Sequence, residues 1–267
     1  MKTLPLFAIA ALFFSLFACE SAVEEEEIIL LPVNMTITLV QGSMTNKIIA
    51  DFHYIPETDL IDHITWSNHQ THYFEYDASD RLAVVRALKV DAKVQEEMWF
   101  VYDGSLVERV DLIKRNLDYV YLEPLDSIYS GYVEMEYNGG KIIRESEYEI
   151  SAGGHMEEYV KNVSYEYDLQ GNLISRTELD PRTGEAEHVI MTYDKSKHPY
   201  GDLQYYFEGE SYVNNMLSKS VEETGFDYTY DLRLNEHEYP EIIYEKLGSS
   251  NTRIFKYSYI NQQPQVF

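Results

Sequence analysis

The chain is poor in cysteine, glycine and proline. It has one cysteine, 13 glycines and 8 prolines among 267 residues. A single thiol cannot form an intramolecular disulfide or supply a zinc site built from several cysteines. Aromatic residues are abundant by contrast, with 24 tyrosines, 11 phenylalanines and 2 tryptophans. Such a chain has enough apolar surface to bury, so its composition indicates a folded protein and not a disordered one.

Positive charge is also in short supply. Lysine and arginine number 21 against 46 aspartates and glutamates, which gives a formal net charge of −25 at pH 7. Because nucleic-acid phosphates are bound mainly by lysine and arginine, we expect no nucleic-acid partner. An acidic surface supports solubility and suits cationic or calcium-bridged partners.

Motifs that carry chemistry are missing from the sequence. It contains no Gly-x-Ser-x-Gly, phosphate-loop, dinucleotide-binding or His-Glu-x-x-His pattern. We therefore expect no catalytic residues and no cofactor, and we predict that the protein is not an enzyme. His63, His69 and His72 form a cluster in the sequence. A step of three residues along a strand changes face, so we expect exposed histidines there and no metal site.

The first 18 residues have the pattern of a secretory signal, with one cation, an apolar run and a small residue before Cys19. The run is shorter than the roughly 20 residues that a membrane-spanning helix needs. Its end, Leu16-Phe17-Ala18-Cys19, resembles the lipobox of bacterial lipoproteins. That resemblance implies cleavage before Cys19, lipidation of its thiol and a membrane partner through the lipid. An ordinary signal peptide is the alternative.

Residues 19–32 are expected to be the lipidated cysteine and an acidic tether. Four consecutive glutamates at 24–27 repel one another and favour an extended, solvated chain. An acidic cluster directly after a lipidated cysteine resembles the surface-export signal of Bacteroidota lipoproteins. It implies a protein anchored by lipid in the outer membrane and displayed on the cell surface, with a periplasm-facing anchor as the alternative.

Residues 33–267 are expected to form one domain of repeated β-hairpins. A short alternating phrase recurs that ends in tyrosine and is often followed by aspartate or asparagine. Its copies end at Tyr54, Tyr76, Tyr102, Tyr137, Tyr167, Tyr193, Tyr230 and Tyr259. In the last copy, Phe255, Tyr257 and Tyr259 alternate with Lys256 and Ser258. A period of two residues indicates a strand with one buried face.

The residues after each tyrosine predict a turn and a return strand. Aspartate or asparagine bonds back to the turn backbone, and glycine supplies a positive φ, as at Asp168 and Gly171. For residues 105–121, apolar residues at helical spacing also allow a helix, but the repeat favours a strand. The fold class that follows is all-β: an antiparallel meander of repeated hairpins that forms a curved, largely open sheet.

The fullest copy, Tyr167-Asp168-Leu169-Gln170-Gly171-Asn172-Leu173, resembles the YD repeats of RHS-type proteins. Together with the lipobox and the acidic leader, it makes the chain similar to uncharacterised Bacteroidota lipoproteins with degenerate YD-like hairpins. The resemblance covers roughly residues 47–260. It implies a hairpin architecture and supplies no catalytic residues.

These observations predict a non-enzymatic, lipid-anchored cell-envelope protein that binds a protein or glycan partner or acts as a scaffold. The alternative is a surface carbohydrate-binding lipoprotein of a glycan-uptake system, because exposed aromatic rings can stack on sugars. A hydrolase is the third possibility. With 46 aspartates and glutamates, a pair of carboxylates can arise by chance, so the presence of a pair carries no information. Trp66 and Trp99 are the candidate ligand-stacking residues. Trp99 is out of phase with Met98 and Phe100, so we expect it to face away from the core.

Overall fold

The computed structural model of the protein describes residues 30–91, 93–117, 124–150, 157–198, 213–248 and 251–261. Cys19 and the expected signal peptide lie outside the described residues, as does the tether up to residue 29. Across the described ranges, no helix is long and apolar enough to cross a membrane.

Sixteen strands make up the described part of the chain. In order they are β1 (Leu30–Gln41), β2 (Met44–Tyr54), β3 (Ile61–Trp66), β4 (Gln70–Tyr76), β5 (Leu82–Lys89), β6 (Val94–Asp103), β7 (Leu106–Leu117), β8 (Pro124–Asn138), β9 (Lys141–Ile150), β10 (Glu157–Tyr167), β11 (Leu173–Leu179), β12 (Ala186–Lys197), β13 (Asn214–Val221), β14 (Phe226–Leu234), β15 (Pro240–Leu247) and β16 (Asn251–Asn261). The expected meander is confirmed, because each strand pairs with its neighbours in sequence. Residues 106–117 form a strand, as the repeat predicted.

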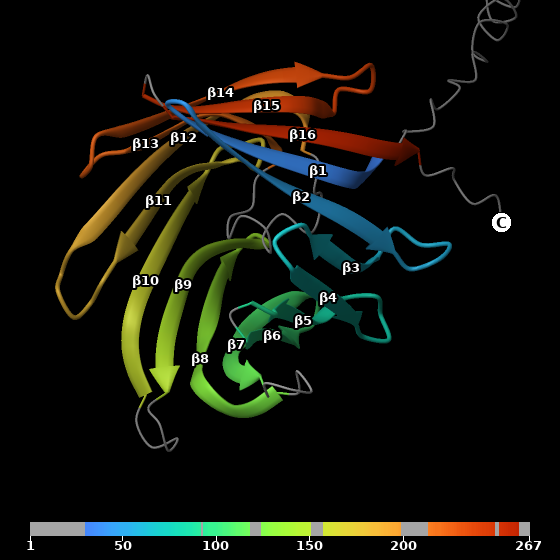
Figure 1. Ribbon diagram of the computed structural model, residues 1–267. Helices are drawn as coiled ribbons and strands as arrows, with labels where there is room; N and C mark the ends of the chain where they lie inside the picture. The colour runs from blue at the N-terminus through green and yellow to red at the C-terminus, as the bar shows by residue number, and fades with distance from the viewer. Residues whose placement is uncertain are drawn as a thin grey trace, which may run out of the picture.

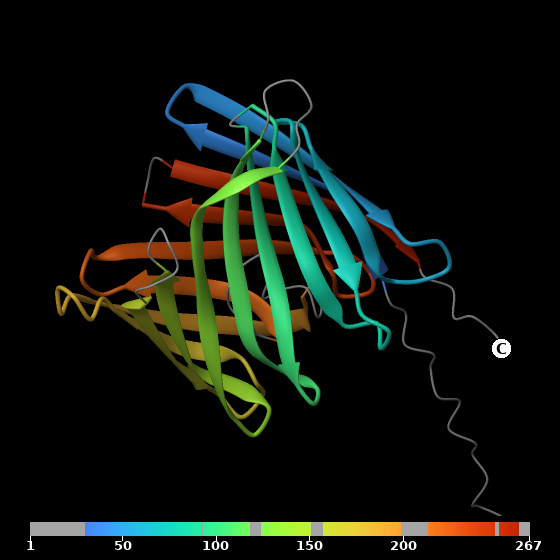
Figure 2. The ribbon, with the colours of Figure 1, turned by 90° about the horizontal axis from the view of Figure 1, so that it is seen from below.

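The expected open sheet is wrong. β1 pairs antiparallel with β16, from Leu30 opposite Asn261 to Gln41 opposite Asn251, so the sheet closes into a barrel. Figure 1 shows this seam, where blue β1 lies beside red β16. Figure 2 shows the long tilted strands that build the wall. Alternation along the chain predicts strands and hairpins, but closure depends on the tilt and stagger summed over all strands.

The wall has one apolar face. The first apolar cluster lies on β1 to β5, and the second lies on β10 to β13. The first contains Met35, Ala50, Phe52, Ile61, Ile64, Phe74 and Val85. The second contains Val163, Tyr165, Leu173, Val189, Met191 and Val221. Ile64 is 0% exposed. On a single-layered barrel, other parts of the wall can cover only the inward face, so these side chains point into the lumen.

The repeat tyrosines join neighbouring strands at one end of the barrel. Each of five donates its hydroxyl to a backbone carbonyl near the start of the preceding strand, at 2.7 to 3.0 Å. The pairs are Tyr54 with Pro32, Tyr76 with Ile61, Tyr102 with Leu82, Tyr137 with Val107 and Tyr259 with Pro240. We call this end, where even-numbered strands finish, the tyrosine end. The opposite end is called the collar end.

Candidate binding site in the barrel lumen

The lumen wall changes character from the tyrosine end to the collar end. In β6 the lumen-facing series runs from Phe100 through Met98 to Glu96. Met98 and Phe100 pack against the first cluster, and strand alternation places Glu96 on the same face. In β5 the equivalent series ends at Lys89, and in β7 it ends at Lys114. In β10, β11, β12 and β16 the charged residues on the same face as the apolar series are Lys161, Arg176, Glu187 and Arg253. We call these charged residues the collar.

Glu96 lies between two lysines of the collar. Its carboxylate bonds to the Lys89 ammonium through one oxygen and to the Lys114 ammonium through the other, the latter at 3.2 Å. Burial alone would disfavour the charged form of Glu96, but the two lysines outweigh it and lower the pKa of the carboxyl. The three side chains retain 31 to 42% of their exposure, so water reaches this part of the wall.

The wall beside Lys89 carries aromatic and neutral polar side chains. Lys89 pairs across the strands with Gln70, which pairs with Trp66. The Trp66 and His72 rings are 5.7 Å apart. Burial, and after it the charge of Lys89, lowers the pKa of His72 to about 4, so this ring is neutral at pH 7. The indole nitrogen of Trp66 is buried without a hydrogen-bond partner in the structure.

Ion pairs continue around the rest of the collar. Lys161 lies 3.3 Å from Glu147, and Arg253 bonds to Glu245. Arg176 contacts two carboxylates, Glu187 at 3.0 Å and Glu178 at 3.8 Å. The collar therefore mixes both signs. Its β5 to β7 portion holds two cations for one carboxylate, and the portion around Arg176 holds one cation for two.

Trp99 lies on the outer surface, which confirms that it faces away from the core. It is 39% exposed. Its indole nitrogen donates to Glu97 at 2.8 Å, and the Arg86 guanidinium lies 5.3 Å from the ring centre. Glu97 also accepts from Arg115 at 3.1 Å. Arg86 therefore occupies one face of the indole ring, and Glu97, which Arg115 also binds, holds the ring edge.

Three tyrosines continue the outer row beyond Trp99. Tyr132 and Tyr148 stack with ring centres 4.8 Å apart, and Tyr148 and Tyr159 lie 5.3 Å apart. The guanidinium of Arg109 lies 5.4 Å from the Tyr132 ring centre. These rings use their faces on one another and on arginine, so they present mainly edges to solvent. The row resembles a cross-strand stabilising ladder more than a flat platform.

The histidines of the sequence cluster lie on different parts of the barrel. His63 stacks on His53 at the outer surface, with ring centres 4.1 Å apart. His69 lies in the turn between β3 and β4 with a φ of 62°, and His72 lies on the lumen side. Within the described ranges, no three His, Cys, Asp or Glu side chains converge on a metal position.

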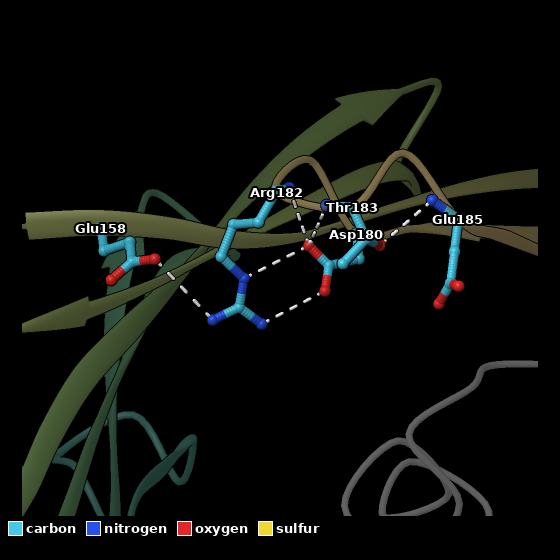
Figure 3. Close-up of polar contacts among 5 residues, drawn as sticks. All are labelled: Glu158, Asp180, Arg182, Thr183 and Glu185. Atoms are coloured by element: carbon cyan, nitrogen blue, oxygen red, sulfur yellow. Dashed lines mark hydrogen bonds and ion pairs between the residues drawn. The ribbon is translucent and has the colours of Figure 1, made fainter.

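The turn between β11 and β12 is a polar cluster at the collar end (Figure 3). One Asp180 carboxylate oxygen accepts from the backbone N–H of Arg182 at 2.8 Å and of Thr183 at 3.4 Å. The Arg182 guanidinium binds the same carboxylate and extends toward Glu158 at 3.8 Å. Hydrogen bonds from Arg182 lower the pKa of Asp180. The Asp180 bonds lie within the turn, and Arg182 ties it to β10 through Glu158, so we assign the cluster a structural role.

Sequence reasoning placed Trp66 and Trp99 among the candidates but missed Lys89, Glu96 and Lys114. A local signal for them exists, because each charged residue is in phase with the apolar positions of its own strand. In the sequence of a single strand, such a charge indicates only that the buried face has ended. Only the pairing of neighbouring strands brings the three together.

Comparison of the sequence with protein-family models and with curated proteins finds no match. Among solved structures, a porin-like protein from Bacteroides vulgatus aligns with a TM-score of 0.51 at 11% identity, over 88% of this chain and 99% of that chain. The two chains share a barrel fold. A porin-like protein from Bacteroides uniformis aligns with a TM-score of 0.42 at 9% identity, over 86% of this chain and 96% of that one.

Proposed function

We propose that the protein is a non-enzymatic, lipid-anchored protein of the cell envelope that binds a ligand in its barrel lumen. One observation carries this proposal: two apolar clusters that share no residue line the lumen, next to a collar of partly exposed charges. Eight strands make a barrel that side chains just fill, whereas 16 to 18 strands enclose a channel. A wall of sixteen strands is therefore of a size that can enclose a channel, which supports a site in the lumen.

Charged residues on the outer face argue against a wall embedded in lipid. A membrane-spanning barrel has an outward apolar band about 25 Å tall. Here strand alternation places charges outward on many described strands, among them Arg86, Asp111, Glu134, Arg144, Glu166, Asp231, Lys246 and Lys256. Arg144 pairs with Glu136 at 3.2 Å, with both side chains at least half exposed. We therefore attribute membrane attachment to lipidation at Cys19 and not to the strands.

Lipidation at Cys19 would orient the barrel. β1 begins at Leu30, at the tyrosine end. The eleven residue steps from Cys19 to Leu30 can span at most about 40 Å. We propose that the tyrosine end faces the outer membrane, and that the collar end opens toward the medium on the cell surface.

Binding in the lumen is testable with an environment-sensitive apolar dye, 1-anilinonaphthalene-8-sulfonate. We would use the chain from residue 19 with Cys19→Ser, which carries every described strand. We expect saturable dye binding that Ala87→Phe weakens at least fivefold, because the lumen-facing Ala87 lies between Val85 and Lys89. Ser164→Phe, at an exposed position on β10, is the matched control. Equal effects of both variants in folded protein would contradict a site in the lumen.

Carbohydrate binding at the outer surface is the second candidate. Trp99 supports it, because an exposed indole lies beside Arg86 and Glu97, which offer hydrogen-bond donors and acceptors. A glycan array with Trp99→Ala and Trp66→Ala variants tests this candidate. Saturable binding lost only in Trp99→Ala would support a surface glycan site. Loss only in Trp66→Ala would place the glycan in the lumen.

A further inference from the structure

We propose that the lumen takes an anionic amphiphile, whose acidic head lies between Lys89 and Lys114 and whose apolar chain points to the tyrosine end. The inference rests on the lumenal binding function proposed above and names the chemical class of its ligand.

The apolar part of the ligand is indicated by the gradient along the wall. From Lys89, the lumen side of β5 continues through Ala87 and Val85 to Leu82, which packs against the first cluster. Seven residue steps at about 3.3 Å make this wall roughly 20 Å long. Partly buried lumen-facing rings of Phe100 and Phe255 pack against the same cluster. Leu82, Ala87 and Phe100 are only partly buried, so an extended acyl chain laid along this wall would remove apolar surface from water.

The sign of the head group follows from the local charge. Lys89 and Lys114 share one carboxylate, that of Glu96, so this portion of the collar has a surplus of one positive charge. The surplus is local, because the chain as a whole carries a formal charge of −25. His72 is neutral and neither adds to nor offsets it. The nearby Gln70 side chain, on the same row as Lys89, adds amide donors.

Glu96 shows that a carboxylate fits between these ammonium groups. It accepts from both lysines while all three side chains remain partly exposed. A ligand carboxylate arriving through the collar end would meet the same donors from the solvent side. Glu96 therefore competes with the ligand head group, and its charge sets how strongly an anion binds.

Calorimetric titration of the Cys19→Ser chain with dodecanoate tests the proposal. We expect saturable binding that the double substitution Lys89→Gln and Lys114→Gln weakens at least tenfold. Glu96→Gln should strengthen binding severalfold, because it removes the competing anion. Lys246→Gln, which removes an outward cation paired with Asp231, is the matched control and should leave the affinity within twofold.

Two further ligands separate the possible failures. Acetate has the acidic head group without the chain, and dodecyl maltoside has the chain with a neutral head group. We expect each of them to bind at least tenfold more weakly than dodecanoate. Equal binding of dodecanoate and dodecyl maltoside, unaffected by the lysine substitutions, would overturn the anionic head group and leave lumenal binding intact. Failure of dodecanoate, dodecyl maltoside and the dye alike, in folded protein, would overturn the lumenal function itself.

Discussion

At the scale of single residues, the abundant tyrosines have two distinct roles. Five of the repeat tyrosines face the lumen and donate their hydroxyls to carbonyls of a neighbouring strand, as Tyr76 does to Ile61 at 3.0 Å. Tyr132 and Tyr148 instead stack at the outer surface. In the sequence, both kinds of tyrosine favour strands. Their place in the alternating pattern decides whether the ring faces the lumen or the outer surface. The repeat phrase thus encodes a hydrogen bond as well as a buried ring.

The repeat tyrosines should make the barrel sensitive to alkali. Burial raises the pKa of Tyr76 and of Tyr137 to about 12, above the ordinary value near 10. Their stabilisation is complete below pH 10 and is lost as the pH rises through 12, because the unfolded chain releases these protons first. We expect Tyr76→Phe to cost about 1 kcal/mol at pH 7. That cost should shrink as the pH approaches 12.

Denaturant unfolding at several pH values measures this effect. Tyr73→Phe is the control, because Tyr73 is an outward residue of the same strand that is 45% exposed. It should leave the free energy of unfolding unchanged. A cost of Tyr76→Phe that is the same at pH 7 and pH 12 would contradict the assigned role of the hydroxyl.

At the scale of elements, one turn structure recurs between paired strands of the barrel. In three turns the first residue donates its N–H to the carbonyl four residues on, and its own carbonyl accepts from the residue three on. Two of these turns start directly after a repeat tyrosine, at Asp77 and Asp168, and the third starts at Asn235, after Leu234. The residue three positions after the first has a positive φ whether it is Gly171, Asp80 or Glu238. The sequence predicted the turns at Asp77 and Asp168, and their geometry is kept in copies without glycine. The expected turns directly after Tyr193 and Tyr230 are wrong, because β12 continues to Lys197 and β14 continues to Leu234.

Substitution of Asn172 should destabilise the protein strongly. Its side-chain oxygen accepts the backbone N–H groups of Val213 at 3.1 Å and Asn214 at 2.9 Å, so it joins the β10–β11 hairpin to the start of β13. We expect Asn172→Ala to lower the free energy of unfolding by about 2–3 kcal/mol, because two backbone donors lose their acceptor.

Urea unfolding of Asn172→Ala beside Leu169→Ala tests this expectation. Leu169 is in the same turn and fully exposed, so its truncation should change stability by less than about 0.5 kcal/mol. Equal small effects of the two substitutions would show that Asn172 does not join the hairpins.

At the scale of the whole molecule, closure of the barrel converts a curved sheet into a lumen. The seam between β1 and β16 pairs residues more than 200 positions apart in the chain, such as Thr38 with Ile254. No property of either strand alone specifies that partner. The lumen, the collar and the separation of inner from outer aromatic residues all depend on this seam.

A designed disulfide tests the seam directly. Thr38 and Ile254 are outward neighbours across it, because Ile37 and Phe255 face the lumen. In the Cys19→Ser chain, Thr38→Cys with Ile254→Cys should oxidise readily, since antiparallel partners have the Cα separation that a disulfide needs. We expect the bond to stabilise the protein by about 2–4 kcal/mol. Ile254→Cys with Ser164→Cys, on distant β10, should stay reduced. Failure of the seam pair to oxidise would indicate an open sheet.

The sequence by itself determined the alternating strands, the turns that follow tyrosines such as Tyr76 and Tyr167, and the outward position of Trp99. These properties are local, because a period of two residues and a turn of a few residues are complete within one hairpin. Only the tertiary structure decided that the sheet closes, and that Lys89, Glu96 and Lys114 meet at one place on the lumen wall. Closure depends on tilt and stagger accumulated over sixteen strands, and the meeting of these charges depends on the register between three of them.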